Sequence, residues 1–355
     1  MLFVDRIIAW QRQHGRHDLP WQNTGDPYRV WLSEIMLQQT QVATVLGYFD
    51  RFVVRFPDIQ SLAAASQDEV MPYWAGLGYY ARARNLHRCA QVVVRDWAGR
   101  FPPTAESIAT LPGIGPSTAA AIAAFSYGEP SPILDGNVKR VFARHFGVHG
   151  DPARKDIERE MWAIAHREVQ AAQPGVADMP AYTQGLMDLG ATLCTRRQPA
   201  CMRCPVQTTC VAARDSLQDV LPTPRVRKAQ ARRATAMLVM VKGDQLLLTQ
   251  RPQTGIWGGL WSLPECAPED DLSAAIHACG VQGEPPLAMA AFEHVFTHFR
   301  LTIQPWYVRV IDSVPPSAPL RWFGRAALAD LGLPAPVRKL VDGLMAQDLA
   351  WDDAD

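Results

Sequence analysis

The sequence predicts a protein of two domains, a larger all-α domain at the N-terminus and a smaller α+β domain at the C-terminus. In residues 1–214 apolar side chains recur at helical intervals, and proline or glycine marks the breaks. Beyond residue 234, short strand-like runs alternate with helix-like segments. Residues 1–233 hold 27 basic and 21 acidic side chains, whereas residues 234–355 hold 8 and 14. The helical domain is therefore the better candidate for binding a polyanion.

Length and composition limit the class of protein. A chain of 355 residues with 48% hydrophobic content can bury two separate cores. No apolar run approaches the roughly 18 to 20 residues that a membrane-spanning helix needs, and no secretory signal is visible. We therefore expect a soluble, cytoplasmic protein.

The first chemically informative segment begins at Asp26, which can cap a helix whose first turn contains Pro27. Glu34 lies in this helix, and its neighbours between Val30 and Leu37 are apolar on nearly every side. We expect Glu34 to be partly desolvated, which would raise its pKa and keep a proton available near neutrality. The alternative is an ordinary surface glutamate.

A short turn with two glycines, Gly113 and Gly115, precedes an alanine-rich helix expected over residues 119–125. This pattern is typical of a helix-hairpin-helix motif, in which backbone amides at the start of the second helix hold a nucleic-acid phosphate. An ordinary turn between two helices would also explain it. Twenty residues after Gly115, Asp135 precedes Gly136 and another helix start.

Asp135 can keep its charge among polar groups at this helix start, although a helix cap would also place an aspartate there. Two carboxyls in contrasting environments are what hydrolysis of a glycosidic bond requires. One is protonated to assist the leaving group, and the other is ionised to stabilise an oxocarbenium-like transition state. Glu34 and Asp135 fit these two roles.

Four cysteines lie within seventeen residues, with intervals of six, two and five residues between them: Cys194, Cys201, Cys204 and Cys210. Short loops of these lengths can wrap a four-iron cubane, which accepts one thiolate at each iron. Zinc sites of four cysteines usually show two Cys-x2-Cys pairs, and only one is present here. Disulfides are the third possibility. The spacing favours an iron–sulfur cluster.

The C-terminal part begins after a basic segment with two prolines, which we interpret as a linker. Two strands joined by a tight turn are expected near residues 236–250, another at 299–310, and helices near 272–279 and 336–345. The predicted boundaries are a helical domain at 1–214 with a cysteine loop at 194–210, a linker at 215–233, the α+β domain at 234–348 and an acidic tail at 349–355.

Taken together, these segments are similar to the adenine-specific MutY-type DNA glycosylases of the endonuclease III superfamily, from the N-terminus to about residue 345. The motifs that carry the resemblance are Leu19-Pro-Trp, Ser33-Glu-Ile-Met-Leu-Gln-Gln-Thr-Gln-Val, Gly76-Leu-Gly-Tyr-Tyr-Ala-Arg-Ala-Arg-Asn, the glycine turn, Leu134-Asp-Gly-Asn-Val and the cysteine spacing. The resemblance implies removal of adenine mispaired with 8-oxoguanine or guanine in duplex DNA. It implies a monomer with one structural 4Fe-4S cluster that flips the base and leaves an abasic site.

The resemblance also implies roles for individual residues. Glu34 would protonate the adenine ring, Asp135 would stabilise the oxocarbenium sugar, and Asn137 would help to order that site. The flipped adenine would meet Arg16, Trp21 and Gln184. The mispair would be recognised by Gln39, Thr40, Tyr79, Phe296, Thr297 and His298. DNA phosphate would be held around Gly113, Gly115 and Ser117.

Two departures narrow the activity that the resemblance implies. Relatives that also cut the strand place a lysine where Ser117 stands, so no amine is available there for a Schiff base. The segments Thr254-Gly-Ile-Trp-Gly-Gly-Leu-Trp-Ser-Leu-Pro-Glu and Phe292-Glu-His-Val-Phe-Thr-His-Phe resemble a MutT-like Nudix domain. The carboxylate helix that would hold magnesium is missing after Pro264. We therefore expect a recognition domain, with Thr297 where the family often has serine.

Three other functions remain as alternatives. The first is an endonuclease III-like bifunctional glycosylase and lyase that acts on oxidised pyrimidines, which Ser117 disfavours. The second is a DNA-binding protein without catalysis, and the third is nucleotide hydrolysis by the C-terminal domain.

Overall fold

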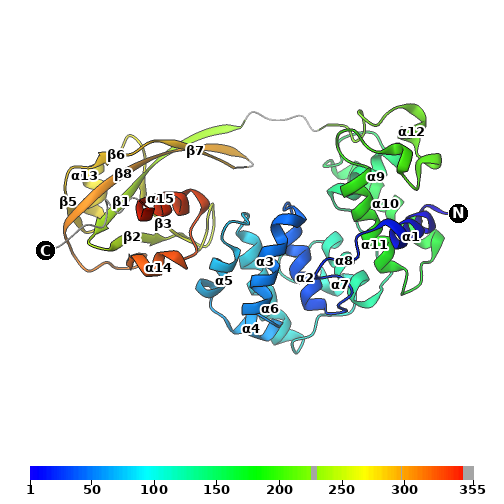
Figure 1. The fold of residues 1–355 in the computed structure, drawn as a ribbon, viewed down its shortest axis with the longest axis horizontal. Helices are drawn as coiled ribbons and strands as arrows, with labels where there is room; N and C mark the ends of the chain where they lie inside the picture. Colours follow the sequence, from blue (N-terminus) through cyan, green and yellow to red (C-terminus); the bar gives the residue numbers. More distant parts are fainter. Residues whose placement is uncertain (225–229, 297, 347–355) are drawn as a thin grey trace. The chain divides into compact units, whose positions relative to one another are not determined.

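The structure is a computed structural model that describes residues 1–224, 230–296 and 298–346. Contacts divide the chain into two compact units, the first made of residues 1–64 and 85–227 and the second of residues 65–84 and 228–355 (Figure 1). Within the described residues, no helix combines the length and the apolar character that crossing a membrane requires.

The first unit is helical, as the sequence predicts. Within its described residues every regular element is a helix or a single helical turn. The elements are α1 (Phe3–His14), α2 (Pro27–Leu37), α3 (Val42–Arg55), α4 (Ile59–Ala64), most of α6 (Ala81–Asp96), α7 (Ala105–Ile108), α8 (Pro116–Tyr127), α9 (Gly136–Phe146), α10 (Lys155–Ala172), α11 (Met179–Asp188), the π-helical turn η1 (Leu189–Leu193), the 3-10 turns η2 (Cys201–Arg203) and η3 (Gln207–Thr209), and α12 (Val211–Asp215).

Helix α8 shows why the elements of the first unit form where they do. Pro116 stands in its first turn, and the left-handed Gly128 ends it with φ of 68°. Its residues between Ala119 and Ala124 are all buried, so α8 is a helix whose apolar surface continues around its circumference. It packs against α2, α7 and α11. α8 therefore contacts both α2, which carries Glu34, and α11, which carries Gln184.

The core of the first unit lies between helices that are distant in the sequence. Buried side chains of α1, α8, α9, α10 and α11 form one continuous cluster, which includes Phe142, Tyr182 and Leu186. Phe3 of α1 meets Phe142 of α9 edge to face, with ring centroids 5.9 Å apart. The N-terminal helix is therefore part of the same core as the helix that follows Asp135.

The second unit is built on a mixed sheet in the order β3-β2-β1-β8-β5, with β4 beside β1, β6 and β7 beside β8, and β9 beside β2. The strands are β1 (Ala231–Lys242), β2 (Gln245–Gln250), β3 (Trp261–Ser262), β4 (Glu265–Cys266), β5 (Val281–Gly283), β6 (Leu287–Ala288), β7 (Phe292–Val295), β8 (Phe299–Ser313) and β9 (Leu320–Gly324). The helices are α5 (Gln67–Trp74), α13 (Leu272–Ala278), α14 (Arg325–Ala329) and α15 (Ala335–Ala346).

The parallel pair of β1 and β8 forms the centre of this sheet, with register from Ala231 opposite Phe299 to Val241 opposite Arg309 (Figure 1). β1 is buried without interruption from Thr235 to Val241, as expected for a central strand covered on both faces. Much of β8 alternates between buried and more exposed residues. The predicted α+β class of this domain is confirmed.

The second unit also contains a segment that the sequence assigns to the helical domain. In residues 65–84, Gln67 Nε2 donates to Gln253 Oε1 at 3.2 Å, and Arg84 Nη1 donates to the Gly258 carbonyl at 2.6 Å. β1 begins at Ala231, inside the predicted linker of residues 215–233. The core of the predicted linker, residues 225–229, and the predicted acidic tail lie outside the described residues.

Candidate active site

Glu34 lies on the strongly apolar helix α2. Asp26 caps this helix by accepting the Tyr28 N–H at 2.9 Å, and Pro27 occupies its first turn, both as predicted. The neighbours Ser33 and Ile35 are buried, while Glu34 itself is half-buried and faces a cavity. Burial, assisted by the charge of Asp135, raises the pKa of Glu34 to about 8. The desolvation that we predict from its neighbours is therefore present.

Asp135 lines the same cavity from the N-terminus of α9, which forms another part of its wall. Its Oδ1 accepts the Val138 N–H at 2.7 Å, so Asp135 is the N-cap of the helix. Burial raises the pKa of Asp135, while the N–H groups of Val138 and Asn137 and the charge of Arg140 act in the opposite direction. The helix cap and the predicted catalytic carboxylate are thus the same residue.

One cavity of about 800 Å³ brings the predicted catalytic residues together. Glu34, Asp135 and Asn137 line it, and so do Gln39, Thr40 and Ser117. Gln39 follows the end of α2 with a left-handed φ of 58°, which turns the chain sharply after the helix. Residues predicted for catalysis and for mispair recognition therefore line the same cavity.

Ser117 contributes to this arrangement from α8. Its Oγ accepts the Leu134 N–H at 2.9 Å, so the segment that leads into Asp135 is attached to the start of α8. The described residues that line this cavity and its neighbour include no lysine. Lys139 of α9 pairs instead with Glu158 at 2.6 Å.

A second cavity, of about 440 Å³, adjoins the first and shares Arg16 and Glu34 with it. It is lined by all three residues predicted to bind the flipped base, Arg16, Trp21 and Gln184. Trp21 is buried and meets Phe49 edge to face, with ring centroids 5.2 Å apart. A mainly apolar pocket with a few convergent polar groups is the usual form of a small-ligand site.

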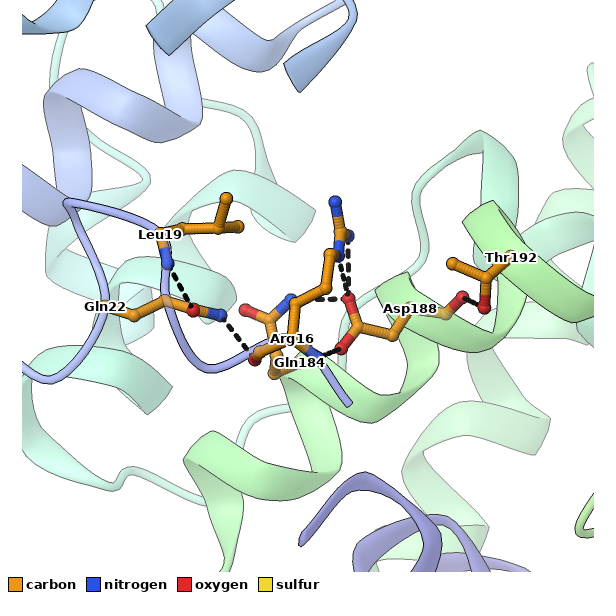
Figure 2. A network of polar contacts seen from close by, with 6 residues as sticks. All are labelled: Arg16, Leu19, Gln22, Gln184, Asp188 and Thr192. Atoms are coloured by element: carbon orange, nitrogen blue, oxygen red, sulfur yellow. Dashed lines mark hydrogen bonds and ion pairs between the residues drawn. The ribbon is translucent and has the colours of Figure 1, made fainter. Parts of the chain in front are cut away.

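Asp188, which the sequence does not single out, organises the polar side of this second cavity (Figure 2). Its buried carboxylate accepts the backbone N–H of Arg16 at 2.9 Å, the Arg16 Nε at 2.7 Å and the Gln184 Nε2 at 2.8 Å. Gln22 holds the following turn, because its Nε2 donates to the Arg16 carbonyl at 3.0 Å and its Oε1 accepts the Leu19 N–H at 3.1 Å. The only signal in the sequence is the four-residue spacing of Gln184 and Asp188 on one helix.

Close packing of two helices fixes the position of Gln184. At the next residue, Gly185, an added Cβ would lie 2.6 Å from Ile7 Cγ2, so α11 and α1 approach as only glycine allows. After Asp188 the helix changes to the π-helical turn η1, and Thr192 Oγ1 donates to the Asp188 carbonyl at 2.8 Å. Such local π-helical turns occur frequently at functional sites.

The glycine turn has the geometry expected of a helix-hairpin-helix motif between α7 and α8. Gly113 has φ of 78°, and an added Cβ would lie 2.6 Å from Asn85 Cβ. Gly115 is the N-cap of α8, and the space around its own Cβ position is open. The amides at the start of α8 can therefore approach a phosphate without side-chain obstruction.

Arg140 of α9 connects the catalytic region with the cysteine loop. Its Nη2 donates to Asn137 Oδ1 at 2.9 Å and to the Gly190 carbonyl at 2.6 Å, and its Nε donates to the Cys194 carbonyl at 2.7 Å. An added Cβ at Gly190 would lie 2.7 Å from Asn137 Cβ, so η1 also packs directly on the start of α9. Burial lowers the pKa of Arg140.

The four predicted cluster ligands line one small cavity, and they are Cys194, Cys201, Cys204 and Cys210. Among the His, Cys, Asp and Glu side chains of the described residues, no group of three or more is placed to hold a single metal ion. A four-iron cubane offers a separate iron to each of four thiolates, so four cysteines around one small cavity fit such a group.

The surroundings of the cysteines also include a positively charged side chain that can stabilise thiolate sulfur. Arg144 Nη1 donates to Cys194 Sγ at 3.4 Å, and its other contacts hold the carbonyls of Thr195 and Leu221 at 2.7 and 2.8 Å. Burial, with the neighbouring cysteines, raises the pKa of Cys204 to about 12. The Cys204 thiol would therefore lose its proton on binding metal rather than in its absence.

The remaining predicted recognition residues lie in the second unit. Phe296 follows β7 and stacks on Phe299, with ring centroids 4.4 Å apart, and Trp257 and His294 pack around it. His298 precedes β8, whereas Thr297 lies outside the described residues. Tyr79 is about half exposed and has a left-handed φ of 48°.

The second unit does not assemble the carboxylates of a magnesium-dependent Nudix enzyme in its described residues. Glu265 forms an ion pair with Arg251 at 2.7 Å, Asp270 accepts the Ala267 N–H, and Asp271 caps α13. Helix α13 itself carries no acidic residue.

Comparison with known proteins agrees with both parts of this description. The model of the HhH-GPD superfamily of base excision DNA repair proteins matches residues 32–167, and that of the NUDIX domain matches residues 235–343. The adenine DNA glycosylase of Buchnera aphidicola subsp. Acyrthosiphon pisum is 33% identical over 96% of this chain and 97% of its own length. The human adenine DNA glycosylase is 32% identical over 90% of this chain and 70% of its own. The solved structure of a thermostable thymine-DNA glycosylase, 28% identical, covers 60% of this chain and 95% of its own with a TM-score of 0.52.

Proposed function

The chain belongs to the adenine DNA glycosylase family, and from this premise we propose that it hydrolyses the N-glycosidic bond of adenine mispaired with 8-oxoguanine or guanine in duplex DNA. The observation that carries the proposal is the pair of carboxyls, Glu34 and Asp135, which line one cavity next to a base-sized pocket.

The two carboxyls would divide the chemistry between them. Glu34, with a pKa of about 8, is protonated at neutral pH and would donate its proton to N7 of adenine as the bond from N9 to C1′ breaks. Asp135, beside two N–H groups and Arg140, would stay ionised and stabilise the oxocarbenium sugar. Water then bonds to C1′ and loses a proton, which leaves an abasic site and free adenine. Asn137, held by Arg140, would order this side of the site.

Adenine must leave the stack for this reaction, because its ring nitrogen and C1′ cannot be reached together inside a duplex. The cavity of about 440 Å³ falls within the usual range for ligand pockets. Trp21 would supply an apolar surface for the base, while Arg16 and Gln184 would supply polar contacts.

The base opposite adenine would be recognised by residues from both units. Gln39 and Tyr79, both with left-handed backbone, would enter the duplex around it, and Thr40 would bond to 8-oxoguanine. Phe296, Thr297 and His298 would sense the oxidised base from the second unit. Phe296 itself is held by aromatic packing on Phe299.

Binding of DNA would use the hairpin and the cysteine loop. The amides that follow Gly113 and Gly115 would hold one phosphate, and the exposed Arg196, Arg197 and Arg203 of the cysteine loop would add positive charge for others. A 4Fe-4S cluster on the four cysteines would hold the loop in shape. We also propose that the protein acts as a monomer, as the resemblance implies.

The same cavity argues against strand cleavage by a Schiff base. That reaction needs an amine near C1′, and Ser117 instead uses its hydroxyl to hold the Leu134 N–H. We therefore propose a monofunctional enzyme.

The test is single-turnover release of adenine from matched duplexes that contain A opposite 8-oxoguanine, A opposite G or A opposite T, with thymine glycol as a fourth substrate. We expect release opposite 8-oxoguanine and G, fastest opposite 8-oxoguanine, with strand breaks only after alkali. Breaks at thymine glycol without adenine release would support the bifunctional alternative. Binding of the mispair without any base release would support a non-catalytic protein.

A further inference from the structure

Asp188 determines which way the Gln184 amide faces. The two atoms of a glutamine amide differ, since the nitrogen donates and the oxygen accepts, and the bonding network decides between the two orientations. A carboxylate paired with a guanidinium accepts hydrogen bonds and does not donate them. The nitrogen of Gln184 must therefore face Asp188, where it lies 2.8 Å from Oδ1 (Figure 2).

The consequence appears on the opposite side of the amide. With Nε2 turned to Asp188, the Gln184 Oε1 is the atom available to a ligand in the second cavity, which Gln184 lines. This oxygen takes part in none of the hydrogen bonds recorded among the described residues. Gln184 can thus offer an acceptor to the pocket, and it cannot offer a donor without breaking its bond to a buried carboxylate.

Asp188 limits Arg16 in the same way. The backbone N–H, Nε and Nη2 of Arg16 all point to the Asp188 carboxylate, with Nη2 2.7 Å from Oδ1. Of the guanidinium nitrogens, Nη1 is left for a ligand. The polar side of the pocket therefore presents a donor from Arg16 and an acceptor from Gln184, and one buried carboxylate fixes both.

We propose that Asp188 is a specificity-determining positioning residue, which makes the pocket select a purine with an exocyclic 6-amino group. Adenine presents a donor at N6 beside an acceptor at N1, which complements this arrangement. A 6-oxo purine reverses both and would place its O6 against the Gln184 Oε1. The inference rests on the proposed function and explains how the base would be chosen there.

The test compares two substrates that differ in one group. Matched duplexes carry either adenine or purine, which has hydrogen at C6, opposite 8-oxoguanine. Single-turnover release is measured for the wild type and for Asp188→Asn, Gln184→Leu and the double variant. Because the two bases differ in leaving ability, only the ratio of wild-type to variant rate for each base is interpreted. The matched control is Asp178→Asn. Asp178 lies directly before α11 and forms an ion pair with Arg12.

We expect Asp188→Asn to slow adenine release by about tenfold or more, and purine release by less than about threefold, because only adenine loses a hydrogen bond. Gln184→Leu should show the same selective loss, and the double variant should be no worse than the more impaired single variant. Asp178→Asn should leave both rates unchanged.

Equal slowing of both bases by Asp188→Asn would show that Asp188 only supports the fold, and the proposal would be wrong. If Asp188→Asn does not fold, Gln184→Leu decides, since equal slowing of adenine and purine by that variant would also overturn the proposal. Failure of the proposed function looks different: the wild type would then release no adenine from any duplex, and the inference would fall with it.

Discussion

The two walls of the catalytic cavity place carboxyls in opposite surroundings. Glu34 stands on α2, whose buried residues are mostly apolar and include Trp31, Leu32 and Ile35. Asp135 stands at the polar start of α9, where two backbone N–H groups face it and Arg140 is near. Burial raises the pKa of both, but only Asp135 has donors that oppose the shift, whereas its charge raises the pKa of Glu34 further.

The comparison shows how one fold can obtain a proton donor and an anion from two carboxyl groups. When two carboxyls share a cavity, the second charge is costly, and the proton stays on the group without hydrogen-bond donors. In the proposed mechanism, α2 therefore supplies the acid and the N-terminus of α9 supplies the anion. Each prediction below removes or perturbs one side of this contrast.

The largest effect is expected from Glu34→Gln, which keeps the shape of the side chain and removes the proton donor. We expect adenine release from duplexes with A opposite 8-oxoguanine to slow by about 10³-fold, within the range for a general acid. Binding of the same duplex should persist, as measured by fluorescence anisotropy. The matched control is Glu160→Gln on the exposed face of α10. An unchanged rate in Glu34→Gln would remove Glu34 from the mechanism.

Asp135→Asn should reduce release by about 10²- to 10³-fold, the range for loss of a preorganised electrostatic partner. Asparagine can still accept the Val138 N–H as an N-cap, so the fold should survive and the effect should report the charge. Circular dichroism and thermal melting would check the fold. A loss of stability that matches the loss of activity would mean that Asp135 acts only as a cap.

The pH dependence of single-turnover release should also distinguish the two walls. Since Glu34 must be protonated and has a pKa of about 8, the rate should fall about tenfold per pH unit above that value. Glu34→Gln should lose this alkaline limb, whereas Glu160→Gln should retain it. An alkaline limb that persists in Glu34→Gln would assign the titration to another group.

Arg140→Gln tests whether the cysteine loop supports the Asp135 wall. The variant loses contacts to Asn137 Oδ1 and to the carbonyls of Gly190 and Cys194. We expect release to slow by about tenfold, the order of effect seen when a supporting contact is removed. The exposed Arg95→Gln is the control. Normal release by Arg140→Gln, with an unchanged melting temperature, would mean that these contacts to the cysteine loop do not affect the surroundings of Asp135.

The sequence predicts the parts of this site that local chemistry specifies. The cap at Asp26, the apolar surroundings of Glu34 and the glycine turn depend on neighbours within a few residues, and the structure has each of them. Family membership, inferred from spaced motifs, is confirmed by relatives over nearly the whole chain. The division into an all-α and an α+β domain follows from the spacing of apolar residues, which is helical in residues 1–214 and differs in the remainder.

The sequence does not predict contacts that join distant segments. Asp188 bonds to Arg16 across more than 170 residues, and Arg140 reaches Cys194 across more than 50. Neither lies in a motif, and an aspartate or arginine on a helix is usually solvated. Likewise, the packing of residues 65–84 in the second unit depends on single contacts such as Arg84 with Gly258. Such residues are found only once the helices are placed.

The smallest expected effect is on stability. Glu34→Gln should raise the melting temperature at alkaline pH, although it lowers activity. Glu34 has a folded pKa of about 8 against an ordinary value of 4.5, so the folded state holds a proton that the unfolded state releases between these values. Folding stability from this group is therefore greatest below pH 4.5 and falls as pH rises to 8. Glu34→Gln, which never ionises, should melt a few degrees above the wild type at pH 8 and close to it at pH 5. Glu160→Gln should show no such difference. An equal gain in melting temperature at both pH values would mean that ionisation of Glu34 does not destabilise the fold. The surroundings of Glu34 on α2 would then not differ from those of Asp135 in the way proposed.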